Sequence, residues 1–146
     1  MTSSPIRFAI LGFGSFAERA ITPALRATQG VELVAIQKRS IDQAREKALE
    51  HRIPLFFDSA DEAVAHPDVD AVFIVSANGA HCAETIAAAK AGKHVLVEKP
   101  MALNVREAEE MIAACAQHHV TLMVGHMIRF SPLVNRMRDV IASGIL

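Results

Sequence analysis

Nearly continuous apolar runs alternate with amphipathic stretches along the whole chain. Runs of this kind are typical of strands buried on both faces of a sheet, and they lie at 8–11, 31–36, 54–57, 71–75, 94–97 and 121–124. The stretches between them have the spacing of helices, at 15–26, 40–51, 59–65, 80–91, 104–118 and 133–142. Pro23 is expected to kink the first of these helices. The alternation predicts an α/β fold, a doubly wound and mostly parallel six-stranded sheet with helices on both faces.

The first apolar run ends in a turn that fits the pattern G-x-G-x-x-A. Its residues are Gly12, Phe13, Gly14, Ser15, Phe16 and Ala17. In a strand–turn–helix unit the first glycine permits a sharp turn, the second admits a pyrophosphate close to the backbone, and the small third residue lets the helix pack on the strand. The first amides of that helix then point at the phosphates. Glycine turns after strands are common, so it is the surrounding alternation of strands and helices that favours a dinucleotide-binding unit.

The end of the second apolar run bears on the choice of cofactor. Units that take NAD usually carry an acidic residue there, which holds the ribose hydroxyls. This chain has Gln37, Lys38, Arg39 and Ser40 instead, and no carboxylate before Asp42. Two cations and a hydroxyl suit the 2′-phosphate of NADP. The alternative is that the cations form a solvated strand end and Ser40 is only the N-cap of the next helix.

Polar and charged residues also follow the later strands of the predicted sheet. Ligands in such sheets bind at the carboxyl ends of the strands, so these residues are expected to share one functional rim. They are Ser76, Ala77 and Asn78 after the fourth strand, Glu98, Lys99 and Pro100 after the fifth, and Gly125, His126 and Arg129 after the sixth. Arg129 either approaches the ligand or pairs with a surface acid, and the sequence alone does not distinguish these two roles. Met127 and Phe130 either fill the core or face a further domain.

Composition narrows the class of protein. A chain of 146 residues that is 51% hydrophobic with a net charge of −1 is expected to form one globular domain. It is not expected to bind nucleic acid or to cross a membrane. The N-terminus does not resemble a signal peptide, and Cys82 and Cys115 lie far apart, which fits free thiols in a reducing cytoplasm. No Cys/His spacing indicates a metal site.

Taken together, the motifs resemble the Gfo/Idh/MocA oxidoreductase family in order and approximate spacing. They are GFGSFA at 12–17, KRS at 38–40, DVDAVFIVSANGAH at 68–81, AGKHVLVEKPMALN at 91–104 and RFSP at 129–132. The resemblance covers essentially the whole chain but only the N-terminal half of a family member. Complete members carry a second α/β domain that forms the floor of the substrate site. The resemblance therefore implies a dinucleotide-binding domain at 1–146, with about 126–146 leading toward that second domain.

The resemblance also implies roles for individual residues. The glycine turn at 12–16 would bind the pyrophosphate, Lys38 stands where NAD-preferring members have Asp, and Arg39 and Ser40 would flank the adenosine phosphate. On the nicotinamide side, the resemblance implicates Ser76, Ala77, Asn78, His81, Glu98, Lys99, Pro100 and Arg129. Glu98 would lie near the nicotinamide ribose, and the Lys99–Pro100 bond would be cis. Ala77 replaces a proline of the family pattern, which leaves the rigidity of that turn open.

The activity implied by the resemblance is hydride transfer between a nicotinamide cofactor, NADP rather than NAD, and a sugar, polyol or similar hydroxyl or carbonyl compound. Lys99 would be the catalytic residue, by hydrogen-bonding the reacting oxygen; the alternative is a solvent-facing strand end before a structural proline. The chain alone is expected to bind cofactor without turnover. A non-catalytic dinucleotide-binding or sensing module and a biliverdin-reductase-like enzyme are the alternatives. Whether the chain forms a homo-oligomer stays open.

Overall fold

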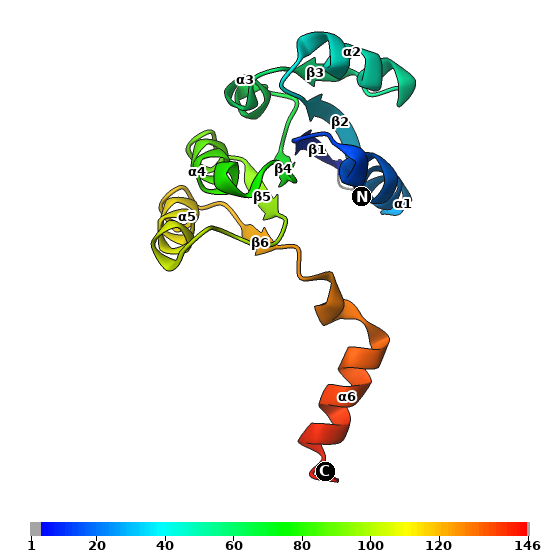
Figure 1. Ribbon diagram of the computed structural model, residues 1–146, viewed down its shortest axis with the longest axis vertical. Helices are drawn as coiled ribbons and strands as arrows, with labels where there is room; N and C mark the ends of the chain where they lie inside the picture. The colour runs from blue at the N-terminus through cyan, green and yellow to red at the C-terminus, as the bar shows by residue number, and fades with distance from the viewer. Residues whose placement is uncertain (1–3, 146) are drawn as a thin grey trace.

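The computed structural model describes residues 4–145, and six strands form one sheet at its centre (Figure 1). The strands are β1 (Ile6–Leu11), β2 (Val31–Gln37), β3 (Leu55–Phe57), β4 (Ala71–Ile74), β5 (His94–Val97) and β6 (Leu122–Val124). Their order in the sheet is β3-β2-β1-β4-β5-β6, and all neighbouring strands pair in parallel. The predicted fold class is confirmed. The direction of winding reverses between β1 and β4, which is where such sheets bind their ligands.

Helices cover both faces of this sheet. The π-helical turn η1 (Ala17–Ile21), α1 (Thr22–Ala27) and α2 (Ile41–Glu50) lie on one face, and α3 (Ala60–Ala65), α4 (His81–Lys90) and α5 (Val105–Gln117) lie on the other. Successive residues of a strand point to opposite faces. Ile10 therefore packs with η1 and α2, whereas Ala9 and Leu11 pack with the second set of helices. Two apolar cores thus fix the sheet from both sides.

The helix after the glycine turn departs from the expected continuous α-helix. It is helical from Ser15 to Ala27 but changes from π to α at Thr22, whose N–H bonds to the carbonyl of Ala17. A proline ring clashes with the carbonyl four residues before it in a regular α-helix. The wider π-turn relieves this crowding and leaves Pro23 in the first turn of α1, a position that proline favours. The π-turn lies directly before the position at which the sequence predicts a kink.

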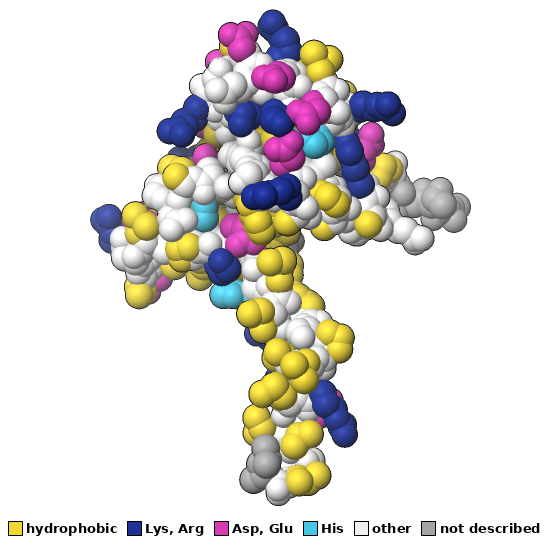
Figure 2. Space-filling model, turned by 45° about the vertical axis from the view of Figure 1, so that its right-hand side comes forward, with side chains coloured by type: hydrophobic (Ala, Val, Ile, Leu, Met, Phe, Trp, Pro, Cys, Tyr) yellow, Lys and Arg dark blue, Asp and Glu magenta, His cyan; other side chains and the backbone are white. Residues whose placement is uncertain are grey.

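The C-terminal segment leaves the sheet after β6. The short helix η3 (Met127–Phe130) and α6 (Pro132–Ala142) extend away from the rest of the chain (Figure 1). Large apolar side chains are exposed along this segment, as the yellow surface in Figure 2 shows: Met127, Ile128, Phe130, Leu133, Met137 and Ile141. Met127 and Phe130 therefore do not fill the core of this domain. An apolar surface of this kind is typical of a contact with another protein or domain.

The two cysteines are free thiols, as their spacing predicts. Cys115 is buried on α5 in the core, and burial raises the pKa of both thiols above the usual range. Among residues 4–145, no helix combines the length and the apolar character needed to cross a bilayer.

Candidate functional site

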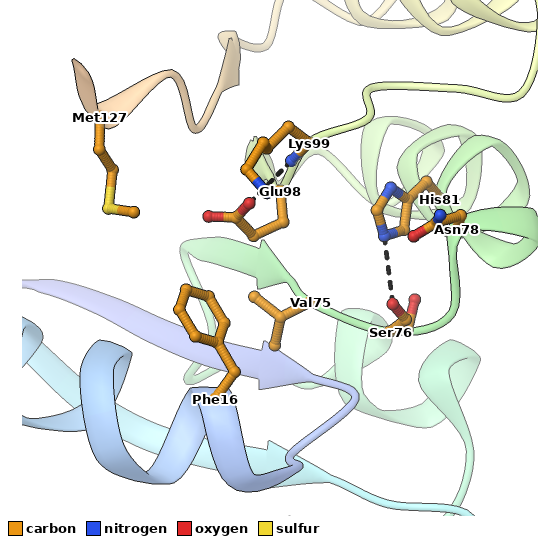
Figure 3. Close-up of a pocket in the computed structure, with 8 residues that line it drawn as sticks. All are labelled: Phe16, Val75, Ser76, Asn78, His81, Glu98, Lys99 and Met127. Atoms are coloured by element: carbon orange, nitrogen blue, oxygen red, sulfur yellow. Dashed lines mark hydrogen bonds between the residues drawn. The ribbon is translucent and has the colours of Figure 1, made fainter. Parts of the chain in front are cut away.

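Two adjoining hollows lie at the carboxyl edge of the sheet. The glycine-loop hollow has a volume of about 400 Å³ and is lined by Gly12, Phe13, Gly14, Gln37, Lys38, Arg39, Gln43, Val75, Ser76, Ala77, Ala80 and Glu84. The Lys99 hollow has a volume of about 260 Å³ and is lined by Phe16, Val75, Ser76, Asn78, His81, Glu98, Lys99 and Met127 (Figure 3). Val75 and Ser76 line both, so residues from the ends of β1, β2, β4 and β5 meet in one site, together with Met127 of η3.

The two glycines of the glycine loop have different structural roles. Gly12 has a φ of +84°, and a Cβ on it would lie 2.4 Å from the Cα of Ser76, so only glycine fits. Around Gly14 the nearest atom to such a Cβ is the carbonyl oxygen of Gly12, at 3.8 Å, so the approach is open. The first bond of the following helix joins the N–H of Glu18 to the carbonyl of Gly14. The amides before Glu18 therefore lack intrahelical partners, which fits a bound diphosphate.

Gln37 fixes the shape of the glycine loop from the end of β2. Its side chain is buried, accepts a hydrogen bond from the N–H of Gly12 at 3.1 Å and donates one to the carbonyl of Asp58 at 2.8 Å. Sequence reasoning assigned no role to Gln37, although a single amide at the end of a buried strand is a signal that it bonds to backbone groups. Gln37 thus holds the glycine loop against the end of β2 and the segment after β3.

The predicted phosphate-binding cations lie beside this loop. The Nζ of Lys38 donates to the carbonyl of Phe13 at 2.9 Å, whereas Arg39 is exposed and its guanidinium takes part in no hydrogen bond among residues 4–145. Ser40 accepts from the N–H of Gln43 at 3.5 Å and is the N-cap of α2. Both cations face the glycine-loop hollow, and Ser40 itself is outside its lining. Ser40 therefore caps α2, and Lys38 and Arg39 directly before it form a positively charged wall of the hollow.

An ion-pair network ties the helix after the glycine loop to α2. Glu18 accepts hydrogen bonds from the Nζ of Lys47 at 2.8 Å and lies 3.0 Å from the Nε2 of His51. These two contacts hold the pKa of Glu18 at about 2. His51 also packs edge-on against the ring of Phe13, with ring centres 5.6 Å apart. Glu18, Glu50 and His51 are close enough for a metal ion, but Lys47 supplies the positive charge between both carboxylates.

The turn after β4 is held by the first turns of α4. The hydroxyl of Ser76 donates to Glu84 Oε2 at 2.6 Å. The buried ring of His81 has Nδ1 2.9 Å from the carbonyl oxygen of Pro100 and Nε2 3.3 Å from that of Ser76. A carbonyl only accepts, so a ring N–H of His81 is the donor, and an imidazole with one N–H donates to one of the two carbonyls. His81 thus lies between the turn after β4 and the segment after β5, and Figure 3 shows its contact with Ser76.

Glu98 and Lys99 lie at the end of β5, and the Lys99–Pro100 bond is cis as predicted. Glu98 is only 7% exposed; its Oε2 accepts from the N–H of Lys99 at 2.9 Å, and its Oε1 has no hydrogen-bond partner among the described residues. A Cβ on Gly125 would approach this oxygen to 3.1 Å, so a glycine there makes room for the carboxylate. A buried acceptor without a partner in the wall of a hollow fits a ligand that donates a hydrogen bond.

Four predicted site residues do not line either hollow: Ser15, Ser40, Pro100 and Arg129. Arg129 is exposed on η3, and a role for it stays a prediction. Six residues line the hollows although the sequence did not predict them as site residues: Gln37, Gln43, Val75, Ala80, Glu84 and Met127. Met127 reaches the site from η3, whose position depends on the tertiary fold, so no local pattern identifies it. Glu84 lies eight positions after Ser76, in the first turn of α4, and its hydrogen bond with Ser76 joins it to the site.

The fold and the two hollows define a dinucleotide-binding domain of the Rossmann type. Residues 6–126 match the model of a family described as an oxidoreductase family with an NAD-binding Rossmann fold. The chain belongs to this family, the Gfo/Idh/MocA oxidoreductases, as its motifs predict.

Individual relatives support this membership. The chain is 38% identical over 138 residues to a 1,5-anhydro-D-fructose reductase of Ensifer adhaerens, covering 94% of this chain and 41% of the reductase. A scyllo-inositol dehydrogenase of Lactobacillus casei with bound NAD(H) and scyllo-inositol has a TM-score of 0.88 at 30% identity, with 97% of this chain and 42% of that one covered. A 3-ketoreductase of Actinomadura kijaniata with NADP and TDP-benzene has a TM-score of 0.90 at 29% identity, with coverages of 98% and 44%. The chain thus spans about two fifths of the length of these relatives.

Proposed function

We propose that this chain is the cofactor domain of an oxidoreductase that transfers a hydride between a nicotinamide cofactor and a sugar, polyol or similar hydroxyl or carbonyl compound. The observation that carries the proposal is the junction of the two hollows at Ser76. On one side of it lie the glycine loop and two cations, and on the other lie a buried carboxylate and an exposed lysine. A dinucleotide bound along this edge would place its two halves in the two hollows.

We favour NADP over NAD as the cofactor. The end of β2 carries Lys38 and Arg39 in place of the acidic residue that would hold the ribose hydroxyls and repel a 2′-phosphate. Arg39 is exposed beside the hollow and free to make a charge-assisted bond to that phosphate. Lys38 adds a positive charge next to the glycine loop, although its ammonium also holds the carbonyl of Phe13.

Lys99 is the catalytic residue in this proposal. Bound nicotinamide supplies or accepts the hydride. In the reducing direction the ammonium of Lys99 would hydrogen-bond the substrate oxygen at the reacting carbon, stabilise the negative charge that develops there and give it a proton. In the oxidising direction the neutral amine would take the proton of the substrate hydroxyl. Its side chain starts from a backbone that Glu98 fixes through the bond to the Lys99 N–H. The Oε1 of Glu98, which has no hydrogen-bond partner among residues 4–145, would accept a hydrogen bond from a ribose hydroxyl of the cofactor.

The chain by itself binds cofactor without turning over substrate in this proposal. It spans about two fifths of the relatives it matches, and its exposed apolar segment at η3 and α6 fits a contact with a further domain. The names of those relatives, a sugar reductase and a polyol dehydrogenase, support the proposed substrate class.

Calorimetric titration of the chain with NADPH, and separately with NADH, tests the proposal. The chain has no tryptophan, so heat is a better signal than energy transfer from protein to cofactor. Binding of both dinucleotides with NADPH the tighter is the expected result. Equal affinities would refute the preference for NADP, and the absence of any binding would refute the role as a cofactor domain.

A further inference from the structure

One acidic side chain lies in the wall of the glycine-loop hollow. The charged residues among the lining of this hollow are Lys38, Arg39 and Glu84. A carboxylate is unfavourable beside a ligand that brings several phosphate charges, because like charges repel strongly away from bulk water. The two cations fit a dinucleotide, whereas Glu84 in its ionised form opposes it. The position of Glu84 therefore needs a physical explanation.

Glu84 is held in this wall by its own hydrogen bond. It lies in the first turn of α4 and is half-buried, and its Oε2 accepts from the hydroxyl of Ser76 at 2.6 Å. Ser76 lines both hollows, so the carboxyl cannot turn away without releasing the turn that joins them.

The surroundings of Glu84 favour its neutral form. Burial raises the pKa of Glu84 above its usual range, while the bond from Ser76 and the proximity of His81 act in the opposite direction and do not cancel the effect of burial. The other charged or titratable groups on the elements around it are Lys38 and Arg39 across the hollow, Glu98 and Lys99 beyond Ser76, Cys82 and Lys90 on α4, Asp61 and Glu62 on α3, and Arg106, Glu107, Glu109, Glu110 and Cys115 on α5.

We propose that Glu84 is a proton-binding residue of the dinucleotide site, whose carboxyl takes up a proton from solvent as the dinucleotide enters the glycine-loop hollow. This inference rests on the proposed function. Protonation removes the repulsion between carboxylate and phosphates and leaves the two cations unopposed. The neutral acid keeps its bond from Ser76 and gains an O–H donor.

The sign of the pH dependence follows from linkage. The negative charges of the ligand make the pKa of Glu84 higher in the complex than in the free chain. Affinity therefore rises as the pH falls from the pKa of the complex to that of the free chain, by at most about tenfold per pH unit for one proton. Below the pKa of the free chain the affinity no longer changes through this group.

Calorimetry in buffers of different ionisation enthalpy measures the protons taken up on binding. Titrations of the unaltered chain, Glu84→Gln and Glu109→Gln with NADH at about pH 6 isolate the effect, because NADH has no 2′-phosphate that titrates in this range. Glu109 is an exposed acid on α5 outside both hollows and is the matched control. We expect net proton uptake by the unaltered chain and by Glu109→Gln, and its loss in Glu84→Gln, which still binds.

Equal proton uptake by Glu84→Gln and the unaltered chain would overturn the inference while leaving the proposed function intact. A failure of the unaltered chain to bind any dinucleotide would overturn both. If Glu84→Gln does not fold, carbon NMR titration of the Glu84 carboxyl in the unaltered chain decides. A pKa that rises when NADH is added supports the inference, and one that stays unchanged refutes it.

Discussion

The Cα of Ser76 lies 2.4 Å from the position that a Cβ on Gly12 would occupy. The two residues are 64 positions apart in the sequence and meet because β1 and β4 are neighbours in the sheet. Their contact is the place where the glycine loop and the turn after β4 pack together and where the two hollows adjoin. Any side chain at position 12 would separate the halves of the site.

Gly12→Ala is expected to lower the free energy of unfolding by about 2–5 kcal/mol, because it adds a clash with Ser76 backbone to an unfavourable φ. Urea denaturation measures the loss. Gly30→Ala is the matched control, since Gly30 also has a positive φ but open space around it, and strain alone costs about 1–2 kcal/mol there. Equal losses for both variants would show that the contact with Ser76 contributes nothing.

Gly14→Val is expected to leave the free energy of unfolding within about 1 kcal/mol of the unaltered chain, because the space around Gly14 is open. The same side chain would occupy the path of a bound diphosphate, so affinity for NADPH and NADH should fall by about 100-fold or more. Calorimetry and urea denaturation on one preparation measure both effects. Retained affinity would mean that this glycine has only a structural role.

Lys38→Ala combined with Arg39→Ala should weaken NADPH binding by about 10- to 100-fold, because two charge-assisted contacts to the 2′-phosphate are lost. NADH binding should change by no more than about threefold. The double variant Lys90→Ala with Arg106→Ala removes two cations that line neither dinucleotide hollow and controls for net charge. A similar loss for both dinucleotides would argue that Lys38 acts through its bond to the Phe13 carbonyl instead.

The ion pair between Arg7 and Asp70 should make stability depend on pH in acid. Arg7 donates to the Asp70 carboxylate from its backbone N–H, Nε and Nη2, at 2.9, 3.0 and 2.8 Å, and holds the pKa of Asp70 at about 2, below its ordinary value of 3.8. Because the pKa is lower in the folded chain, the stabilisation is present above about pH 4 and is lost as the pH falls toward about 2.

Asp70→Asn should therefore be less stable than the unaltered chain at neutral pH and should lose less stability between about pH 5 and pH 2. Thermal unfolding across this range measures the difference. Glu32→Gln, at an exposed acid on β2, is the control and should follow the unaltered chain. Parallel pH profiles for Asp70→Asn and the unaltered chain would contradict the assignment of this dependence to the Arg7–Asp70 pair.

Much of the fold follows from local patterns. The nearly continuous apolar runs predict all six strands, because a strand buried on both faces needs apolar residues at successive positions. Ser40, Ser59 and Asn104 lie where helices are predicted to begin, and each caps its helix by accepting a hydrogen bond from a backbone N–H three residues later. The first helix is less regular than its apolar spacing predicts, because that spacing does not show the steric crowding around Pro23 that the π-turn relieves.

The site depends both on short motifs that the sequence shows and on hydrogen bonds between residues that are distant in the sequence. A glycine loop, two cations after a strand and a Glu-Lys-Pro segment are visible in the sequence because each is a short run with a recognisable order. The support beneath them is not local: Gln37 bonds to Gly12, and His81 to Pro100. These partners become neighbours only when parallel strands align their carboxyl ends.

The sequence by itself thus determined the α/β fold, the family and the positions at the edge of the sheet where chemistry is expected, because these depend on residue types at short spacing. Only the tertiary structure decided that the edge contains two hollows joined at Ser76, and that an acid from α4 lies in the wall facing two cations. The structure also decided that Met127 reaches the Lys99 hollow while the apolar segment after it stays exposed. These features depend on contacts between residues far apart in the chain, and such contacts arise from packing of the whole sheet rather than from any local pattern.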